Sequence, residues 1–124
     1  MIRRLSIALV LLAALVNPGR ALAADITGKW TASFETQIGQ QNYTYDFVVK
    51  ESALTGKVKS NLGEGEVLEG KVAGDKVTFT EILKFEGMEI RITYTGTVVN
   101  ADEIKFTRQV GDFATEELVA RRAK

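Results

Sequence analysis

Two charged side chains, Glu81 and Arg108, lie in runs of alternating apolar and polar residues at positions where an apolar residue is expected. Glu81 stands two residues after Phe79. Arg108 likewise stands two residues after Phe106. Because residues two apart on a β-strand share one face, we expect both charges to point inward with their apolar neighbours. A buried charge needs a partner, so the two side chains belong either to a binding site or to a structural ion cluster.

Two interpretations of these inward charges stay open. In the first, Arg108 joins Tyr45 and Tyr94 to form an anchor for a weakly acidic ligand, with Glu81 beside them. In the second, Glu81, Arg108 and Glu117 neutralise one another inside a packed core. The second requires that Glu117 lies on the inward face of the last strand.

The composition leaves little material for catalysis. The chain has no histidine and no cysteine, which removes the commonest general base, the thiol nucleophile and most transition-metal ligands. A pair of glutamates of the glycosidase kind is the remaining enzymatic option, but any acidic barrel shows such pairs. We therefore predict that the protein is not an enzyme, with no catalytic residue, no cofactor and no metal site.

The start of the chain has the pattern of a signal peptide. Two arginines precede an apolar run over residues 5–16, and small residues two apart follow at 21–23. We predict a Sec-type signal peptide over residues 1–23, cleaved before Ala24, and a single domain over residues 24–124 in the periplasm or secreted. The apolar run is shorter than the roughly 20 residues that span a bilayer, so no stable membrane insertion is expected after cleavage.

Charge and length describe a small, mildly acidic domain. Loss of residues 1–23 would remove three of the 16 basic residues and no acidic residue, leaving 13 basic against 16 acidic side chains. Such a balance predicts no nucleic-acid partner. With no cysteine for a disulfide, apolar packing and backbone hydrogen bonds must carry the stability.

The elements that must position the inward residues are β-strands. Residues after the predicted leader alternate between apolar and polar in short runs separated by Gly, Asn or Asp, with no helical spacing. No predicted helix covers the apolar face of the sheet, so the sheet must close on itself, and the short connections make it antiparallel. We predict an all-β, eight-stranded, up-and-down barrel with strands at 27–36, 42–50, 54–60, 66–72, 76–84, 88–98, 103–110 and 113–122.

The connections of such a barrel alternate between two chemically different ends. One end carries tight polar turns, and the other, which we name the rim, carries Ile38, Leu62, Phe85 and Met88 in its loops. These apolar residues form a portal for an apolar ligand, a contact patch for another protein, or a cap folded over the barrel.

A resemblance to a known group concerns the end opposite the rim. Gly28-Lys29-Trp30 opens the first strand there, and the last strand returns to the same end with Arg121 and Arg122. This resembles the calycins, meaning lipocalins, fatty-acid-binding proteins and avidins, where a Gly-x-Trp tryptophan packs under a basic residue from a late strand. The resemblance implies a barrel floor of Trp30, Arg121 and Arg122 joined by a cation–π contact. It also implies a role for inward arginine and tyrosine in binding.

Two members of similar outline differ from this chain. The chain has a single tryptophan, so it cannot have the tryptophan-lined biotin pocket of the avidins. Bacterial periplasmic metalloprotease inhibitors also share the Gly-x-Trp start, but they are usually disulfide-bonded, whereas this chain has no cysteine. The resemblance therefore covers architecture and leaves function open.

We predict a non-catalytic exported barrel that binds a small apolar or weakly acidic ligand through Arg108, Tyr45, Tyr94 and Glu81. The alternative is a periplasmic protein-interaction module, inhibitor-like, that contacts a partner with the rim loops or with the mature N-terminus at residues 24–26.

Overall fold

The computed structural model describes residues 23–123. The signal peptide predicted over residues 1–23 therefore lies, except for its last residue, outside the described residues. In the part that the structure describes, no helix is long and apolar enough to cross a membrane.

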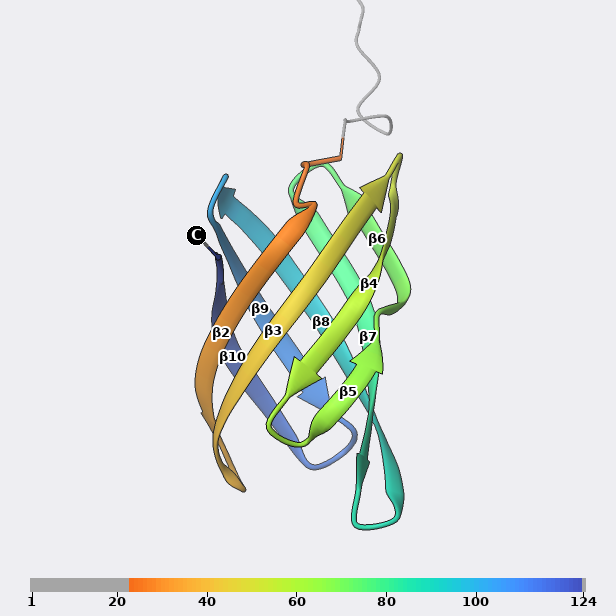
Figure 1. Ribbon diagram of the computed structural model, residues 1–124, viewed down its shortest axis with the longest axis vertical. Coiled ribbons are helices and arrows are strands. Elements are labelled where there is room, and N and C mark those ends of the chain that lie inside the picture. Colours follow the sequence, from red (N-terminus) through yellow and green to blue (C-terminus); the bar gives the residue numbers. More distant parts are fainter. Residues whose placement is uncertain (1–22, 124) are drawn as a thin grey trace, which may run out of the picture.

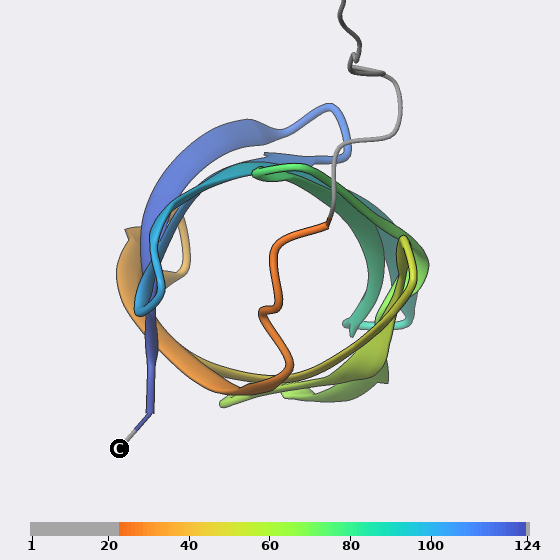
Figure 2. The same ribbon diagram turned by 90° about the horizontal axis from the view of Figure 1, so that it is seen from above.

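Antiparallel strands form a single sheet that closes into a ring (Figure 2). The order around the sheet is β3-β2-β10-β9-β8-β7-β6-β4-β5, and pairing of β3 with β4 completes the ring. β5 and β6 follow one another along the chain and both pair with β4, so together they occupy one position in the ring. The ring therefore has eight strand positions, and the predicted eight-stranded antiparallel barrel is confirmed. The strands are β2 (Gly28–Thr36), β3 (Gly39–Lys50), β4 (Ala53–Ser60), β5 (Gly63–Glu66), β6 (Leu68–Ala73), β7 (Lys76–Phe85), β8 (Met88–Asn100), β9 (Glu103–Val110) and β10 (Ala114–Arg122).

The fourth strand position of the ring differs from the single strand predicted at residues 66–72. It is divided into β5 and β6, and the register with β7 shifts between Leu68 and Lys71, where Glu69 has a φ of 54°. A shift of one residue exchanges the two faces of a strand. Leu68, which alternation alone places inward, is therefore 38% exposed, and Val67 takes the inward position.

Rings from four strands fill the middle of the barrel in what we name the aromatic layer: Tyr45, Phe47, Phe79, Tyr94 and Phe106. The centroid of the Phe79 ring is 4.2 Å from that of Tyr94 and 5.6 Å from that of Phe47. The rings of Phe106 and Tyr45 follow at 5.7 Å and 6.0 Å. All five side chains are buried, so the centre of the barrel is packed with side chains, as in other small barrels.

The floor of the barrel is closed by the segment that precedes β2, which crosses the end of the ring (Figure 2). Ile26 is buried there, and its carbonyl accepts a 2.8 Å hydrogen bond from Trp30 Nε1. The guanidinium carbon of Arg122 lies 4.6 Å from the centroid of the Trp30 ring. Arg122 also donates to the carbonyl of Thr27 at 2.9 Å. This packing joins the segment before β2 to the last strand, β10.

Arg121 does not belong to the floor, contrary to the prediction. It pairs with Thr31 in the β2–β10 ladder, whereas Arg122 pairs with Trp30. Successive residues of a strand face opposite sides of the sheet, so Arg121 points outward, where it forms an ion pair with Glu103 at 3.4 Å. The floor therefore uses one arginine.

Candidate ligand-binding site

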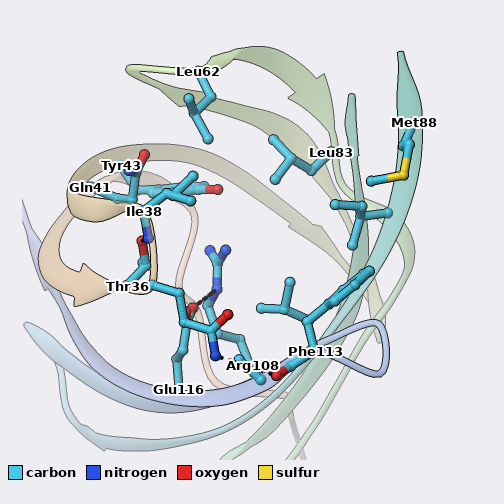
Figure 3. Close-up of a pocket in the computed structure, with 14 residues that line it drawn as sticks. Thr36, Ile38, Gln41, Tyr43, Leu62, Leu83, Met88, Arg108, Phe113 and Glu116 are labelled. Atoms are coloured by element: carbon cyan, nitrogen blue, oxygen red, sulfur yellow. Dashed lines mark hydrogen bonds and ion pairs between the residues drawn. The ribbon is translucent and has the colours of Figure 1, made fainter. Parts of the chain in front are cut away.

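A cavity of about 190 Å³ opens at the rim, and the residues that line it are drawn in Figure 3. The rim is the end of the barrel that carries the β2–β3, β4–β5, β7–β8 and β9–β10 connections (Figure 1). Its wall is mainly apolar, and its polar groups are few. The apolar lining residues are Ile38, Leu62, Leu83, Met88, Ile90, Val110, Phe113 and Ala114. The polar ones are Thr36, Gln37, Gln41, Tyr43, Arg108 and Glu116.

The predicted rim residues surround the mouth of this cavity as far as the structure describes them. Ile38 is 51% exposed, Met88 is 50% exposed and Leu62 is half-buried. The side chain of Phe85 lies outside the described residues, although its backbone pairs with Met88 in the β7–β8 hairpin. Phe113 joins the mouth and is 61% exposed. The last strand, predicted to begin at Phe113, begins one residue later as β10.

Arg108 forms the base of the cavity and is 3% exposed. Its guanidinium carbon lies 4.9 Å from the ring centroids of both Phe34 and Tyr43, so two aromatic rings flank the charge. Nη1 donates a 2.7 Å hydrogen bond to the hydroxyl of Tyr94. Nε lies 2.9 Å from Oε1 of Glu116. Figure 3 shows the guanidinium in the middle of the barrel mouth, beside Glu116.

A hydrogen-bonded network continues beneath Arg108. The hydroxyl of Tyr94 donates to Oε1 of Glu81 at 2.8 Å, and the hydroxyl of Tyr43 donates to Oε2 at 3.1 Å. The hydroxyls of Tyr45 and Tyr94 are 2.9 Å apart. Because the single proton of Tyr94 goes to Glu81, Tyr45 is the donor in that bond. Arg108 Nη1 is 3.9 Å from Glu81 Oε1, which makes the two an ion pair.

The four predicted ligand-binding residues therefore lie at different depths. They form one connected cluster, but Arg108 is the one that lines the cavity. Tyr45 and Tyr94 belong to the aromatic layer below it and are 0% exposed. Glu81, 4% exposed, faces the tyrosine hydroxyls rather than the cavity. The ion-cluster interpretation describes this buried part, and the binding interpretation is restricted to Arg108 and the residues above it.

Glu116, not Glu117, is the acidic partner supplied by the last strand. The side chain of Glu116 is 12% exposed and pairs with Arg108, whereas Glu117 is exposed on the outer face. Leu118 and Ala120 are buried in the same alternation as Glu116. The prediction for Glu117 is wrong because β10 has apolar residues on both faces, which hides the parity of the strand.

Gln41 is a site residue that sequence analysis missed. It lies at the wall of the cavity, is 3% exposed, and its Oε1 has no hydrogen-bond partner among residues 23–123. The second strand, predicted to begin at Asn42, begins at Gly39 as β3 and includes Gln41. The signal that could have found it is its spacing of two residues from Tyr43.

Burial controls the protonation of this cluster. Burial raises the pKa of Glu81 above its ordinary value of 4.5, although the charge of Arg108 and the hydrogen bonds from Tyr94 and Tyr43 act in the opposite direction. Burial, followed by the charge of Glu81, raises the pKa of Tyr43 to about 12. Burial also raises the pKa values of Tyr45 and Tyr94 well above the ordinary value for tyrosine, so all three hydroxyls keep their protons at neutral pH.

Glu81 also borders a second cavity, at the side of the barrel. This cavity of about 240 Å³ lies between β5 and the outer half of β7, and Glu81, Glu64 and Glu66 are among its lining residues. In the described ladders β5 pairs with β4, whereas β7 pairs with β6 and β8. Across residues 23–123, no group of three or more acidic, histidine or cysteine side chains is arranged to hold a metal ion.

The raised pKa of Glu81 gives a pH dependence of stability with a defined sign. An acid whose pKa is higher in the folded state contributes stability that is complete below its unfolded pKa and is lost as pH rises through its folded pKa. The unsubstituted protein should therefore gain unfolding free energy relative to Glu81→Gln as pH falls from neutral to about 4.5. Urea titrations at several pH values measure the difference. Glu66→Gln, an exposed change of the same kind, should show no such trend, and a Glu81→Gln difference that is flat with pH would contradict the assignment.

Comparison of the chain with protein-family models, with curated proteins and with solved structures found no match.

Proposed function

We propose that this chain is an exported, non-catalytic barrel of the calycin type that binds a small, mainly apolar molecule in the rim cavity. The observation that carries the proposal is an open cavity with an apolar wall and one buried arginine at its base. Ligand sites typically combine such a wall with a few placed polar groups. Transfer of apolar ligand surface from water to the wall supplies the binding free energy.

The size of the cavity limits the ligand. An apolar cavity of about 150 Å³ holds benzene, and the rim cavity is about 190 Å³. The aromatic layer fills the barrel below Arg108, so a long acyl chain has no room inside. The ligand is therefore a single-ring molecule or a short branched chain whose polar group meets Arg108 and whose apolar part contacts the rim.

Other parts of the proposal rest on separate observations. The contact of Arg122 with Trp30 at the floor supports the calycin assignment. The pattern of residues 1–23 supports export, and the lack of histidine and cysteine supports a non-catalytic role.

Filling the cavity should weaken binding. Val110 lies on the cavity wall, and phenylalanine at this position would occupy the space of a small ligand. We expect Val110→Phe to weaken binding of toluene by about tenfold or more, equal to about 1.4 kcal/mol. The measurement is NMR titration of a protein carrying ¹³C-labelled methionine methyl groups, because Met88 lies in the wall.

A matched control uses the outer surface. Val48 is 50% exposed on β3 and lies outside the cavity lining, so Val48→Phe should leave toluene binding unchanged. Equal loss of binding in both variants, or no toluene-dependent shift of Met88 in the unsubstituted protein, would overturn the proposal. Native mass spectrometry of the exported protein should also detect a small bound molecule.

A second candidate function, protein interaction at the rim, has one observation in its favour. Ile38, Met88 and Phe113 are half or more exposed at the same end of the barrel. An inhibitor-like partner contact would lose affinity in Ile38→Asp and Phe113→Asp, and affinity capture from the exported proteome measures this. The version that uses the mature N-terminus has less support, because Ile26 is buried in the floor and Ala24 donates to the carbonyl of Gly74.

A further inference from the structure

The charged side chains at the base of the cavity limit the kind of polar group that a ligand can place there. Among the described residues that line the cavity, Arg108 is the single cation, and it already has two carboxylate partners. Glu116 Oε1 is 2.9 Å from Nε, and Glu81 Oε1 is 3.9 Å from Nη1. A ligand carboxylate would add a further negative charge to a site whose single cation is already neutralised.

This imbalance holds in either protonation state of Glu81. With Glu81 ionised, a bound anion would make three negative charges face one positive charge. With Glu81 protonated, Glu116 and the anion would still outnumber Arg108. Unbalanced charge in a buried site carries a large desolvation cost, so the base of the cavity disfavours anions.

The unpartnered polar atoms point to the complementary chemistry. Gln41 lines the cavity and is only 3% exposed. Its Oε1 lacks a hydrogen-bond partner within the described chain. Oε1 of Glu116 and Nε of Arg108 are 2.9 Å apart but are not aligned as a hydrogen bond, so an acceptor and a donor are both unpartnered there, and an amide offers a group to each. Buried acceptors without donors cost free energy, and a donor on the ligand would recover it.

We propose that the cavity selects ligands whose polar group donates hydrogen bonds and carries no negative charge, such as a primary amide. The inference rests on the proposed function and specifies its ligand class. Gln41 accepts from the ligand, Glu116 provides a second acceptor, and Arg108 offers its remaining donors to the carbonyl oxygen of an amide. This polar group differs from the weakly acidic one that the sequence suggested.

The test compares toluene, benzamide and benzoate, which share one ring and differ in the polar group. The reporter is the methyl resonance of Met88 in the full chain, in which the other methionine is Met1. Fluorescence of Trp30, at the opposite end of the barrel, verifies folding. We expect benzamide to bind about tenfold more tightly than benzoate, with toluene binding as an apolar reference.

Two variants with the same charge change separate the site from the overall charge of the protein. Glu116→Gln removes a carboxylate beside Arg108 and keeps an acceptor oxygen, so the affinity of benzoate relative to that of benzamide should rise about tenfold. Glu117→Gln removes a neighbouring carboxylate from the outer face and should change neither. Gln41→Leu should reduce the preference for benzamide over toluene.

The outcomes distinguish the inference from the function on which it rests. Toluene binding together with benzoate binding as tight as benzamide would overturn the inference and leave the proposed function standing. Equal effects of Glu116→Gln and Glu117→Gln on benzoate would also overturn it. Absence of any Met88 shift with all three probes would overturn the proposed function and this inference with it.

Discussion

Replacement of Arg108 by methionine is expected to lower the free energy of unfolding by about 3–5 kcal/mol, because it leaves Glu81 buried without its cation. Arg108 is 3% exposed, donates to Tyr94 and pairs with both Glu81 and Glu116. Methionine is long and apolar enough to keep contact with the flanking rings of Phe34 and Tyr43, so the loss reports mainly on charge. Urea unfolding followed by Trp30 fluorescence measures it.

Two further variants control this prediction. Arg91→Met removes an exposed arginine that pairs with Glu69, and it should cost no more than about 1 kcal/mol. The double variant Arg108→Met with Glu81→Gln should be more stable than Arg108→Met alone, since it removes the stranded carboxylate. A loss below about 1 kcal/mol for Arg108→Met would show that the buried cluster is not held by this charge.

Replacement of Trp30 by alanine should cost a similar amount, about 3–5 kcal/mol, because it opens a void in the floor. Trp30 is 0% exposed, donates to the carbonyl of Ile26 and lies under Arg122. Since the variant lacks the indole, far-UV circular dichroism should follow its unfolding. Toluene affinity should stay within about twofold of the unsubstituted protein, because the floor and the cavity are at opposite ends of the barrel.

Arg122→Met separates the indole from the cation above it. That variant should lose about 0.5–2 kcal/mol from the cation–π contact, together with the hydrogen bonds to Thr27 and Asp25. Trp30→Ala should therefore be clearly the more damaging of the two. Equal losses would mean that the indole contributes little beyond its contact with Arg122.

Alternation was enough to predict the barrel, because apolar and polar residues alternate along the strands and no helix within residues 23–123 covers the apolar face of the sheet. It also identified Trp30, Tyr45 and Phe79 as inward residues, which burial bears out. It failed where local geometry breaks the period. The register shift between Leu68 and Lys71 places Leu68 on the outer face, whereas Val72, beyond the shift, keeps its inward position.

The candidate site was less predictable, since alternation gives the face of a residue and not its depth. Tyr94 and Arg108 are paired across β8 and β9, but the hydroxyl of Tyr94 ends below the guanidinium that lines the cavity. The distance of an inward residue from the rim depends on the register, that is, on which residues of neighbouring strands pair. The register is set by closure of the whole ring and cannot be read from one strand. Register likewise decides between Arg121 and Arg122 at the floor, through the pairing of Arg122 with Trp30.

The aromatic layer has a practical consequence for engineering. It separates the packed floor from the rim, where several side chains are half-exposed. The two ends of the barrel can therefore be altered independently. Side chains such as Ile38, Met88 and Phe113 can be exchanged to reshape the mouth for other small molecules with little effect on the packing beneath. Libraries restricted to the mouth would retain folded members at high frequency.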